Sequence, residues 1–261
     1  MKLIDLHCHI LPGVDDGSKD LQMSLDLAKV AVSQGISHIL LTPHHMDGTY
    51  TNHSQDVVSQ TAYFQNALEI NRIPLKVFPG QEVHLTGDLT RAIAIGDVLF
   101  MDETRRYLLL ELPHDSVPGY TTDMLFDVIT RGITPVLAHP ERNAGFQKDP
   151  DKLYEFVKMG CLTQLTASSY VGVFGSKVQR LTEKMVKANL GYTFASDAHN
   201  FEGRRFLMKE AFDKLAKEEG QEKAELFNEN AKNIINGDDV ADMDSQKISE
   251  MFKQRKRFWL F

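Results

Sequence analysis

The stretch Leu6-His7-Cys8-His9 places two imidazoles one residue apart, at the end of an apolar segment that reads as a buried strand over residues 2–7. Residues i and i+2 of a strand share a face, so His7 and His9 can reach one ion while Cys8 faces the core. A three-residue pattern is a weak signal because it arises often by chance. Whether it marks a metal site depends on the side chains at the ends of the other strands.

The composition is typical of a globular protein. Hydrophobic residues make up 42% of the 261 residues, which suffices for a sizeable core. Single-domain α/β barrels have about 250 residues, so we expect one domain over residues 1–240 and a tail over residues 241–261. The net charge of −7 disfavours a nucleic-acid-binding surface.

The cysteines and the apolar segments bear on the compartment. Cys8 and Cys161 provide no disulfide framework, and the lack of a C-x-x-C pair argues against a thiolate zinc site. The N-terminus lacks the apolar core of a signal peptide, and no stretch approaches the roughly 18–20 apolar residues of a membrane span. These features favour a soluble protein of the reducing cytoplasm.

Strand and helix patterns alternate along the chain. Strands are expected at residues 2–7, 37–42, 75–78, 107–112, 134–138, 161–165 and 192–195. Helices are expected at residues 21–34 (capped by Ser18 or Asp20), 54–71 (capped by Ser54), 122–131, 150–159, 176–188, 205–219 and 222–235, with a loop at residues 167–172. Seven strand-then-helix units predict parallel strands joined by right-handed crossovers, in a barrel or a doubly wound sheet.

The polar residues after the strands favour the barrel. A closed barrel brings the carboxyl ends of all strands to one face, whereas an open sheet would spread them widely. We therefore predict a distorted seven-stranded (β/α) barrel that resembles a TIM barrel. The residues expected at that face are His7, His9, Asp15, Asp16, His44, Glu82, Glu111, His139, Asp197 and His199.

This group of side chains predicts a metal centre. Imidazoles and carboxylates without cysteine suit Mn²⁺, Fe²⁺ or Zn²⁺, whereas so much imidazole disfavours Mg²⁺. About ten ligands are too many for one ion and suffice for two or three. Glu82 is the natural candidate for a carboxylate that bridges two ions. His45 is interpreted as a solvated loop residue or a proton donor, and we give His38, His53, His84 and His114 a structural role.

Two arginines follow these motifs. Arg142 comes three residues after His139, and Arg204 five residues after His199, so both are expected on barrel loops beside the ions. The planar guanidinium matches phosphate oxygens, and its charge stabilises the transition state of phosphoryl transfer. Each arginine alone would be read as a surface residue, but the pair predicts a phosphate clamp.

The motifs together resemble the PHP superfamily of metal-dependent phosphoesterases, and most closely its bacterial branch of manganese-dependent tyrosine-protein phosphatases, found with capsule and exopolysaccharide genes. They are Asp5-Leu-His-Cys-His-Ile-Leu-Pro, Asp15-Asp16-Gly17, Thr42-Pro43-His44-His45, Pro79-Gly80-Gln81-Glu82, Leu110-Glu111, Ala138-His139-Pro140-Glu141-Arg142 and Ala195-Ser196-Asp197-Ala198-His199-Asn200. Other branches often have histidine where this chain has Glu111 and the aspartate. That difference points away from the polymerase-associated and histidinol phosphatase branches.

The resemblance implies a seven-stranded barrel, three metal ions and hydrolysis of protein phosphotyrosine. It assigns one ion to His7, His9, Glu82 and Asp197, a second to Glu82, Glu111 and His139, and a third to His44, His199 and one of Asp15 and Asp16, for which we prefer Asp16. The implied ion is manganese, with iron or zinc as alternatives. The implied partner is a membrane-associated bacterial tyrosine kinase, which would place the chain in the cytoplasm near the membrane.

A metal-generated hydroxide would attack phosphorus in line while Arg142 and Arg204 hold the phosphate oxygens. The thiol route is disfavoured, because a C-x5-R motif would need arginine where Val14 and Ala167 stand. We expect chelation to abolish activity and Cys8→Ser to preserve it.

Two other classes of function stay open. Another metallohydrolase, such as a histidinol-phosphatase-like enzyme, a nuclease or an amidohydrolase, would use similar ligands. Many amidohydrolases carry a carboxylated lysine where this chain has Glu111, and a nuclease should be more basic. A non-catalytic, metal-stabilised docking protein would enclose its ions and would not need Arg142.

The C-terminal end combines Lys253, Arg255, Lys256 and Arg257 with Phe258-Trp259-Leu260-Phe261. Basic and aromatic residues together suit contact with a membrane surface or a partner. Packing on the barrel or on a neighbouring subunit is an equal alternative, and the oligomeric state is left open.

Overall fold

Parallel strands that alternate with helices form the frame of the protein in the computed structural model, which describes residues 2–251. The strands are β1 (Leu3–Cys8), β2 (Ile36–Leu41), β3 (His44–His45), β4 (Lys76–Pro79), β5 (Glu82–His84), β6 (Tyr107–Glu111), β7 (Thr134–Ala138), β8 (Leu162–Thr166) and β9 (Thr193–Ala195). The helices are α1 (Leu21–Ser33), α2 (Ser54–Ile70), α3 (Leu89–Ala94), α4 (Thr121–Thr130), η1 (Pro140–Arg142), α5 (Ala144–Lys148), α6 (Asp151–Met159), α7 (Ala167–Tyr170), α8 (Ser176–Lys187), α9 (Met208–Glu219) and α10 (Gln221–Asn236). The predicted parallel α/β fold is confirmed.

The strands pair in two sheets within the described residues. One sheet has the order β1-β2-β4, and a second, curled sheet has the order β3-β5-β6-β7-β8-β9. All seven expected strands are present, but the short strands β3 and β5 were not predicted. They follow β2 and β4 directly, and pairing continues across both breaks, because Gly80 N donates to Leu41 O (2.8 Å) and Glu82 N donates to Pro43 O (3.1 Å).

The interruption has a local cause in the sequence. Pro43 has no N–H group for a ladder hydrogen bond, so the strand is broken where it occurs. Gly80 lies so close to Leu40 that an added Cβ would be only 2.8 Å from Cγ of that leucine. After the break, His44 and Glu82 occupy paired positions at the start of β3 and β5.

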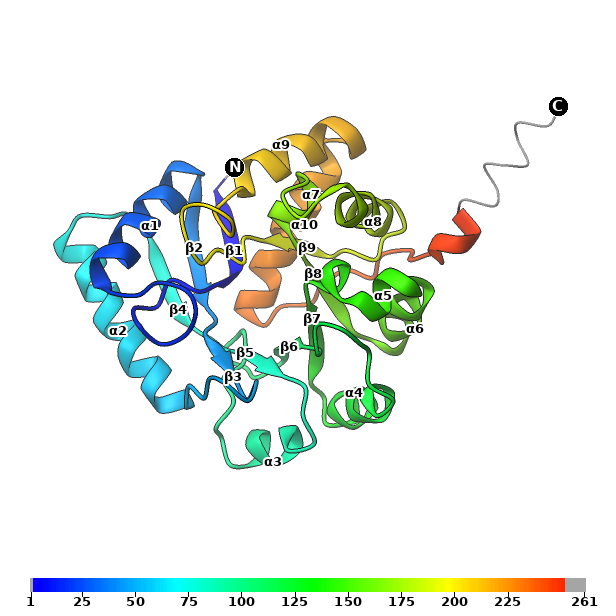
Figure 1. Cartoon of the computed structure of the whole chain (residues 1–261), viewed down its shortest axis with the longest axis horizontal. Helices are drawn as coiled ribbons and strands as arrows, with labels where there is room; N and C mark the ends of the chain where they lie inside the picture. Colours follow the sequence, from blue (N-terminus) through cyan, green and yellow to red (C-terminus); the bar gives the residue numbers. More distant parts are fainter. Residues whose placement is uncertain (1, 252–261) are drawn as a thin grey trace.

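The first and last strands meet at the other side of the ring (Figure 1). Cys8 and Ala198 form an isolated parallel bridge. Around it, Asp197 N donates to His7 O (2.9 Å) and His9 N donates to Ala198 O (3.0 Å). These bonds bring the segment after β9 beside the end of β1, although nearly 190 residues separate them.

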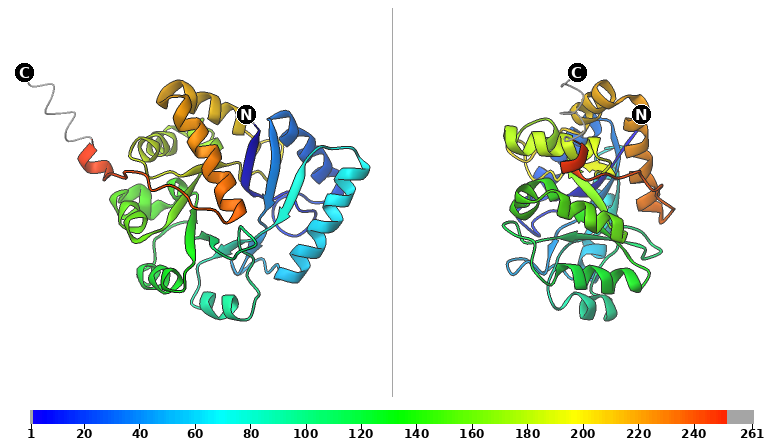
Figure 2. Two further views of the ribbon diagram at one scale, coloured as in Figure 1. Left: turned by 180° about the vertical axis from the view of Figure 1, so that it is seen from behind. Right: turned by 90° about the vertical axis from the view of Figure 1, so that its right-hand side faces the viewer.

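Helices flank the strands on the outside, with α1 and α2 beside the first sheet and α4, α6 and α8 beside the second (Figures 1 and 2). Helix α10 packs at the opposite ends of the strands from the loops that follow them. Asn228 Nδ2 donates to Lys2 O (3.0 Å), Ile4 N donates to Asn228 Oδ1 (3.2 Å), and Asn230 Nδ2 donates to Tyr192 O (2.9 Å). Helix α10 therefore lies at the amino ends of the strands and leaves their carboxyl ends uncovered.

The helix boundaries largely follow the local signals. Asp20 is the N-cap of α1, and its Oδ1 accepts from Met23 N (2.9 Å). The prediction for α2 is wrong by one residue: His53 is the N-cap, and the Ser54 hydroxyl instead donates to Gly96 O (2.8 Å). The expected loop at residues 167–172 was also wrong, because Ala167–Tyr170 form the short, buried helix α7.

In the described part of the chain, no helix is long and apolar enough to cross a membrane. The basic and aromatic residues 253–261, for which we predicted a membrane or partner contact, lie outside the described residues.

Candidate metal centre

The nine predicted metal ligands converge at the carboxyl ends of the strands. They form four overlapping groups, and within each group one possible ligand atom of every residue lies within 4.8 Å of the others. The groups are His9, Asp16, His44 and His199; His7, Glu82 and His139; His7, His9 and Asp197; and His44, Glu82 and Glu111. Residues that are far apart in the sequence therefore form one continuous cluster.

Glu82 occupies the middle of this cluster and is fully buried. Its Oε1 lies 2.6 Å from His139 Nε2, and its Oε2 lies 3.1 Å from both His7 Nε2 and His44 Nδ1. One carboxylate thus contacts imidazoles from three strand ends. This is the arrangement expected of a carboxylate that bridges two ions.

The spacing of the ligand atoms fits divalent ions. His7 Nε2 and His9 Nε2 are 3.0 Å apart, and two imidazole nitrogens bound at right angles to one ion would be roughly 3 Å apart. Three atoms of the cluster are buried without a hydrogen-bond partner: His44 Nδ1, Glu82 Oε2 and His199 Nε2. Buried polar atoms without partners are costly, and bound cations would satisfy them.

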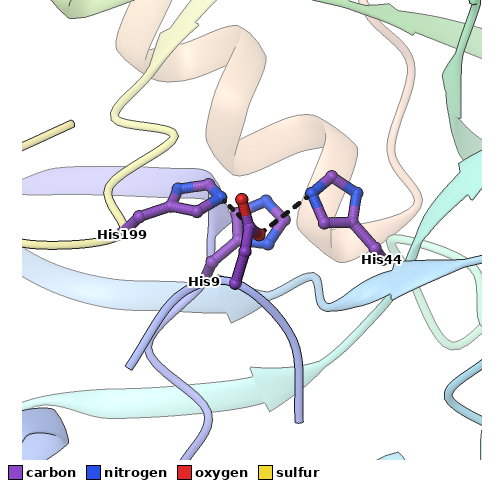
Figure 3. A group of neighbouring side chains, drawn as sticks. His9, His44 and His199 are labelled. Atoms are coloured by element: carbon purple, nitrogen blue, oxygen red, sulfur yellow. Dashed lines mark ion pairs between the residues drawn. The ribbon is translucent and has the colours of Figure 1, made fainter. Parts of the chain in front are cut away.

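Asp16 forms a group with His9, His44 and His199. Figure 3 shows these three histidines with their rings close together. Asp16 Oδ1 lies 3.2 Å from His199 Nε2 and 3.4 Å from His44 Nε2. The His9 and His199 rings stack with their centroids 3.9 Å apart. The Asp16 side chain is 43% exposed, so the cluster opens to solvent on this side.

Asp15 lies behind the cluster. Its Oδ2 is 2.7 Å from His9 Nδ1, and its Oδ1 accepts from Gly17 N (3.0 Å). A carboxylate in this position fixes the ring and tautomer of a metal-binding histidine. Gly17 is needed for this turn, since an added Cβ would lie 1.9 Å from His9 O. Asp15 thus supports His9, and Asp16 is the aspartate that faces His44 and His199.

Gln164 has a similar supporting role that our sequence interpretation missed. Its Oε1 lies 2.8 Å from His7 Nδ1, so a proton on Nδ1 leaves the Nε2 lone pair facing the cluster. His199 Nδ1 is held in the same way, 2.9 Å from Asp197 O. The sequence could have pointed to Gln164, because it is a polar residue in the middle of a buried strand.

Two of the candidate ligands have unusual backbone conformations. His139 (φ 34°), directly after β7, and Asp197 (φ 50°), two residues after β9, lie in the left-handed region. Such conformations cost about 1–3 kcal/mol and are concentrated at functional sites. They turn the two side chains from the strand direction into the ring, which the sequence did not reveal.

Arg142 and Arg204 both lie beside the cluster. Arg142 Nη2 is 2.5 Å from Asp197 Oδ2, and Arg204 Nη2 is 3.1 Å from Asp197 Oδ1. Arg204 Nη1 also contacts Asp16 Oδ2 at 3.1 Å. The Nε–H groups of both arginines are buried without an acceptor, so each retains a donor for an anion.

The charges in the cluster are strongly coupled. Burial opposes the charge of His7, but Glu82 and Asp197 outweigh it and raise its pKa to about 9. Burial likewise opposes the charge of His44, but the nearby carboxylates of Asp16 and Glu82 raise its pKa to about 12. Without metal, the neighbouring carboxylates therefore hold protons on His7 and His44, where divalent ions would take over the positive charge. By contrast, burial and the neighbouring His9 lower the pKa of His199 to about 4.

Three histidines outside the predicted ligand set have different surroundings from one another. His84 Nδ1 lies 3.3 Å from Glu111 Oε2, so this residue contacts a candidate ligand. His45, which we favoured as a solvated loop residue, is instead buried, and both of its ring nitrogens lack hydrogen-bond partners. His53 pairs with Asp97 at 2.9 Å, away from the cluster.

The fold and the site define a class of parallel α/β proteins that gather histidine and carboxylate side chains beyond their strands to bind metal ions. Within that class, the chain belongs to the CpsB/CapC family of capsular polysaccharide synthesis, whose model matches residues 3–236.

The relatives of this chain match over nearly their full length. It is 38% identical to the tyrosine-protein phosphatase YwqE of Bacillus subtilis, over 99% of this chain and 100% of that protein. It is 30% identical to the tyrosine-protein phosphatase CpsB of Streptococcus pneumoniae, over 89% of this chain and 98% of that protein.

Solved structures support the same family. A chain from the crystal structures of YwqE and CpsB, described as metal-dependent tyrosine phosphatases, has a TM-score of 0.91 and 38% identity, covering 94% of this chain and 99% of that chain. A β-aspartyl dipeptidase from Fervidobacterium islandicum shares the fold alone, with a TM-score of 0.53 and 15% identity over 89% of this chain and 72% of that chain.

Proposed function

We propose that this chain is a metal-dependent protein-tyrosine phosphatase that regulates the synthesis of capsular or extracellular polysaccharide. The observation that carries the proposal is the pair of partly buried arginines, each with a buried and unused Nε–H, beside the histidine and carboxylate cluster. This combination suits a dianionic phosphate ester. The full-length relatives named tyrosine-protein phosphatases support the choice of phosphotyrosine.

The metal assignment is the one that the family resemblance implies, and the proximity of these side chains supports it. We assign one ion to His7, His9, Glu82 and Asp197, a second to Glu82, Glu111 and His139, and a third to Asp16, His44 and His199. Mixed imidazole and carboxylate ligands without sulfur suit manganese, iron and zinc, and we prefer manganese because the family resemblance favours it. When bound, such ions supply a hydroxide nucleophile near neutral pH and neutralise the charge of the phosphate.

The side chains of the protein bind the phosphate and orient the metal ligands. Arg142 and Arg204 bind the non-bridging oxygens of the phosphate and stabilise the charge that spreads over them during the reaction. Asp197, which contacts both guanidiniums, orients them before the substrate arrives. Gln164 and Asp15 keep His7 and His9 turned toward the centre.

A cysteine-based route finds no support in the surroundings of Cys8. Its side chain is buried, and its Sγ lies 3.7 Å from Ala198 O. Burial raises the pKa of this thiol well above its ordinary value, so the thiolate nucleophile is not available near neutral pH.

The partner we propose is a membrane-associated bacterial tyrosine kinase with phosphorylated tyrosines, and the place of action is the cytoplasmic face of the membrane. Residues 253–261 would contact that surface. Residues 1–240 would form a single domain, a seven-stranded distorted barrel in which β2 with β3, and β4 with β5, each count as one interrupted strand.

The test compares substrates and metals. The purified chain, stripped with a chelator and reloaded with Mn²⁺, Fe²⁺ or Zn²⁺, is assayed on a phosphotyrosyl peptide, the same peptide with phosphoserine, histidinol phosphate and single-stranded DNA. We expect metal-restored hydrolysis of the phosphotyrosyl peptide above the others. Activity that resists chelation, or a preference for histidinol phosphate or DNA, would refute the proposal.

A further inference from the structure

A partly exposed aromatic ring covers one of the two arginines. Phe174 lies in the loop between α7 and α8 (Figure 1), and the Arg142 guanidinium carbon is 5.2 Å from the centre of its ring. The Arg142 side chain is only 12% exposed. The guanidinium therefore lies between the Phe174 ring and the cluster, where its Nη2 contacts Asp197 Oδ2.

The loop holds Phe174 in a defined position. Val173 N donates to Ser168 O (2.9 Å), and Gly175 N donates to Gly172 O (3.1 Å). Gly172 and Gly175 have φ of 93° and 87°, a conformation that other residues rarely adopt. Because these bonds fix the backbone on both sides, the ring is presented in advance of any ligand.

Packing alone does not account for this arrangement. Val173, the residue before Phe174, is 42% exposed and Phe174 is partly exposed, so the loop presents two neighbouring apolar residues, one of which covers Arg142. An exposed apolar group on a fixed loop at the edge of a site is typical of a surface that contacts a ligand.

The chemistry of the substrate suggests which ligand group meets the ring. In a phosphate ester only the bridging oxygen, two bonds, separates phosphorus from the first carbon of the alcohol group. A phosphate held by Arg142 therefore brings that group close to Phe174. Aromatic rings attract one another at centroid distances of about 4.5–7 Å, in stacked or edge-to-face arrangements. An alkyl group offers no such flat partner.

We propose that Phe174 forms one wall of the subsite for the phenyl ring of phosphotyrosine and thereby selects aryl over alkyl phosphate esters. This inference rests on the proposed phosphatase function and names the origin of its specificity. Phe174 acts by direct contact with the substrate ring, in addition to covering Arg142.

The test uses binding of phosphonates, which are not hydrolysed. Inhibition constants for phenylphosphonate and methylphosphonate are measured against hydrolysis of a phosphotyrosyl peptide by the metal-loaded wild type, Phe174→Ala and Phe174→Leu. We expect Phe174→Ala to weaken phenylphosphonate about three- to tenfold while methylphosphonate is unchanged. Phe174→Leu keeps an apolar cover on Arg142 and should show an intermediate loss. Phe126→Ala, an equally simple change at a 60% exposed phenylalanine of α4, is the control.

Each outcome is decisive. If Phe174→Ala and Phe174→Leu weaken both phosphonates equally, the residue only positions Arg142 and the inference is wrong. If neither constant changes, Phe174 does not contact the ligand and the inference is again wrong. A wild type that hydrolyses no phosphotyrosyl peptide after metal loading would overturn the proposed function itself, which separates the two failures. If Phe174→Ala does not fold, the ratio of the two inhibition constants is measured for Phe174→Leu instead.

Discussion

Replacement of Arg142 by alanine is the sharpest test of the proposed phosphate clamp. The guanidinium contributes an Nη2 contact to Asp197 at 2.5 Å and a buried Nε–H without an acceptor. Both groups are fixed before substrate binds, because Phe174 covers the guanidinium and Asp197 orients it. The substitution therefore removes donors that are already aimed at the position of the phosphate.

The magnitude depends on the donors that the variant retains. Loss of one preorganised donor to a developing charge lowers kcat by about 10²–10³, or about 2.7–4 kcal/mol. Arg204 stays in place, with its Nη2 3.1 Å from Asp197 Oδ1. We therefore expect Arg142→Ala to lower kcat by about 10²–10³ and by no more than that. Arg142→Lys keeps the charge but loses the planar fork, and roughly a tenfold loss is expected.

The assay is steady-state hydrolysis of a phosphotyrosyl peptide by manganese-loaded protein, with metal content measured on the same samples. Metal content should not change, because the substitution leaves the candidate ligands intact and Asp197 keeps its contact with Arg204. Arg131→Ala, which removes an exposed arginine paired with Asp127 on α4, is the matched control. An Arg142→Ala enzyme with wild-type kcat and full metal content would refute the clamp.

Three further predictions concern the metal centre and the cysteine. Glu82→Gln removes the charge of the central carboxylate, so at least one ion should be lost, and elemental analysis that finds full occupancy would contradict its bridging role. Gln164→Ala removes the support of His7 and should weaken metal binding about 10–100-fold in a chelator-competition titration, whereas unchanged affinity would reduce Gln164 to packing. Cys8→Ser should retain kcat on the phosphotyrosyl peptide, because burial raises the pKa of the Cys8 thiol and keeps it protonated; a complete loss in a folded, metal-loaded variant would revive a thiol mechanism.

The interrupted strands have both local and non-local causes. Apolar runs located β2 and β4 to within one residue at each end, because burial of consecutive side chains is a local property. The short strands β3 and β5 have two and three residues and no periodicity of their own. They exist because β3 pairs with β5 and β5 pairs with β6, and pairing between separate segments is a non-local cause.

The ligand pair Asp15 and Asp16 shows the same limit at the site. Two adjacent aspartates are equivalent as letters in a sequence. Their roles differ because the turn at Gly17 directs Asp15 to the back of His9 and Asp16 to the front of His44 and His199. Only the path of the folded chain makes that distinction.

For Leu6-His7-Cys8-His9, the sequence by itself determined that these histidines end a buried strand and that similar polar groups follow the other strands. Strand alternation and the common direction of parallel strands suffice for that conclusion. The tertiary structure alone decided which atoms meet: the position of Glu82 among four imidazoles, the support from Gln164, the left-handed turns at His139 and Asp197, and the ring of Phe174 over Arg142. These depend on distances between segments that are remote in the chain, and no local pattern encodes them.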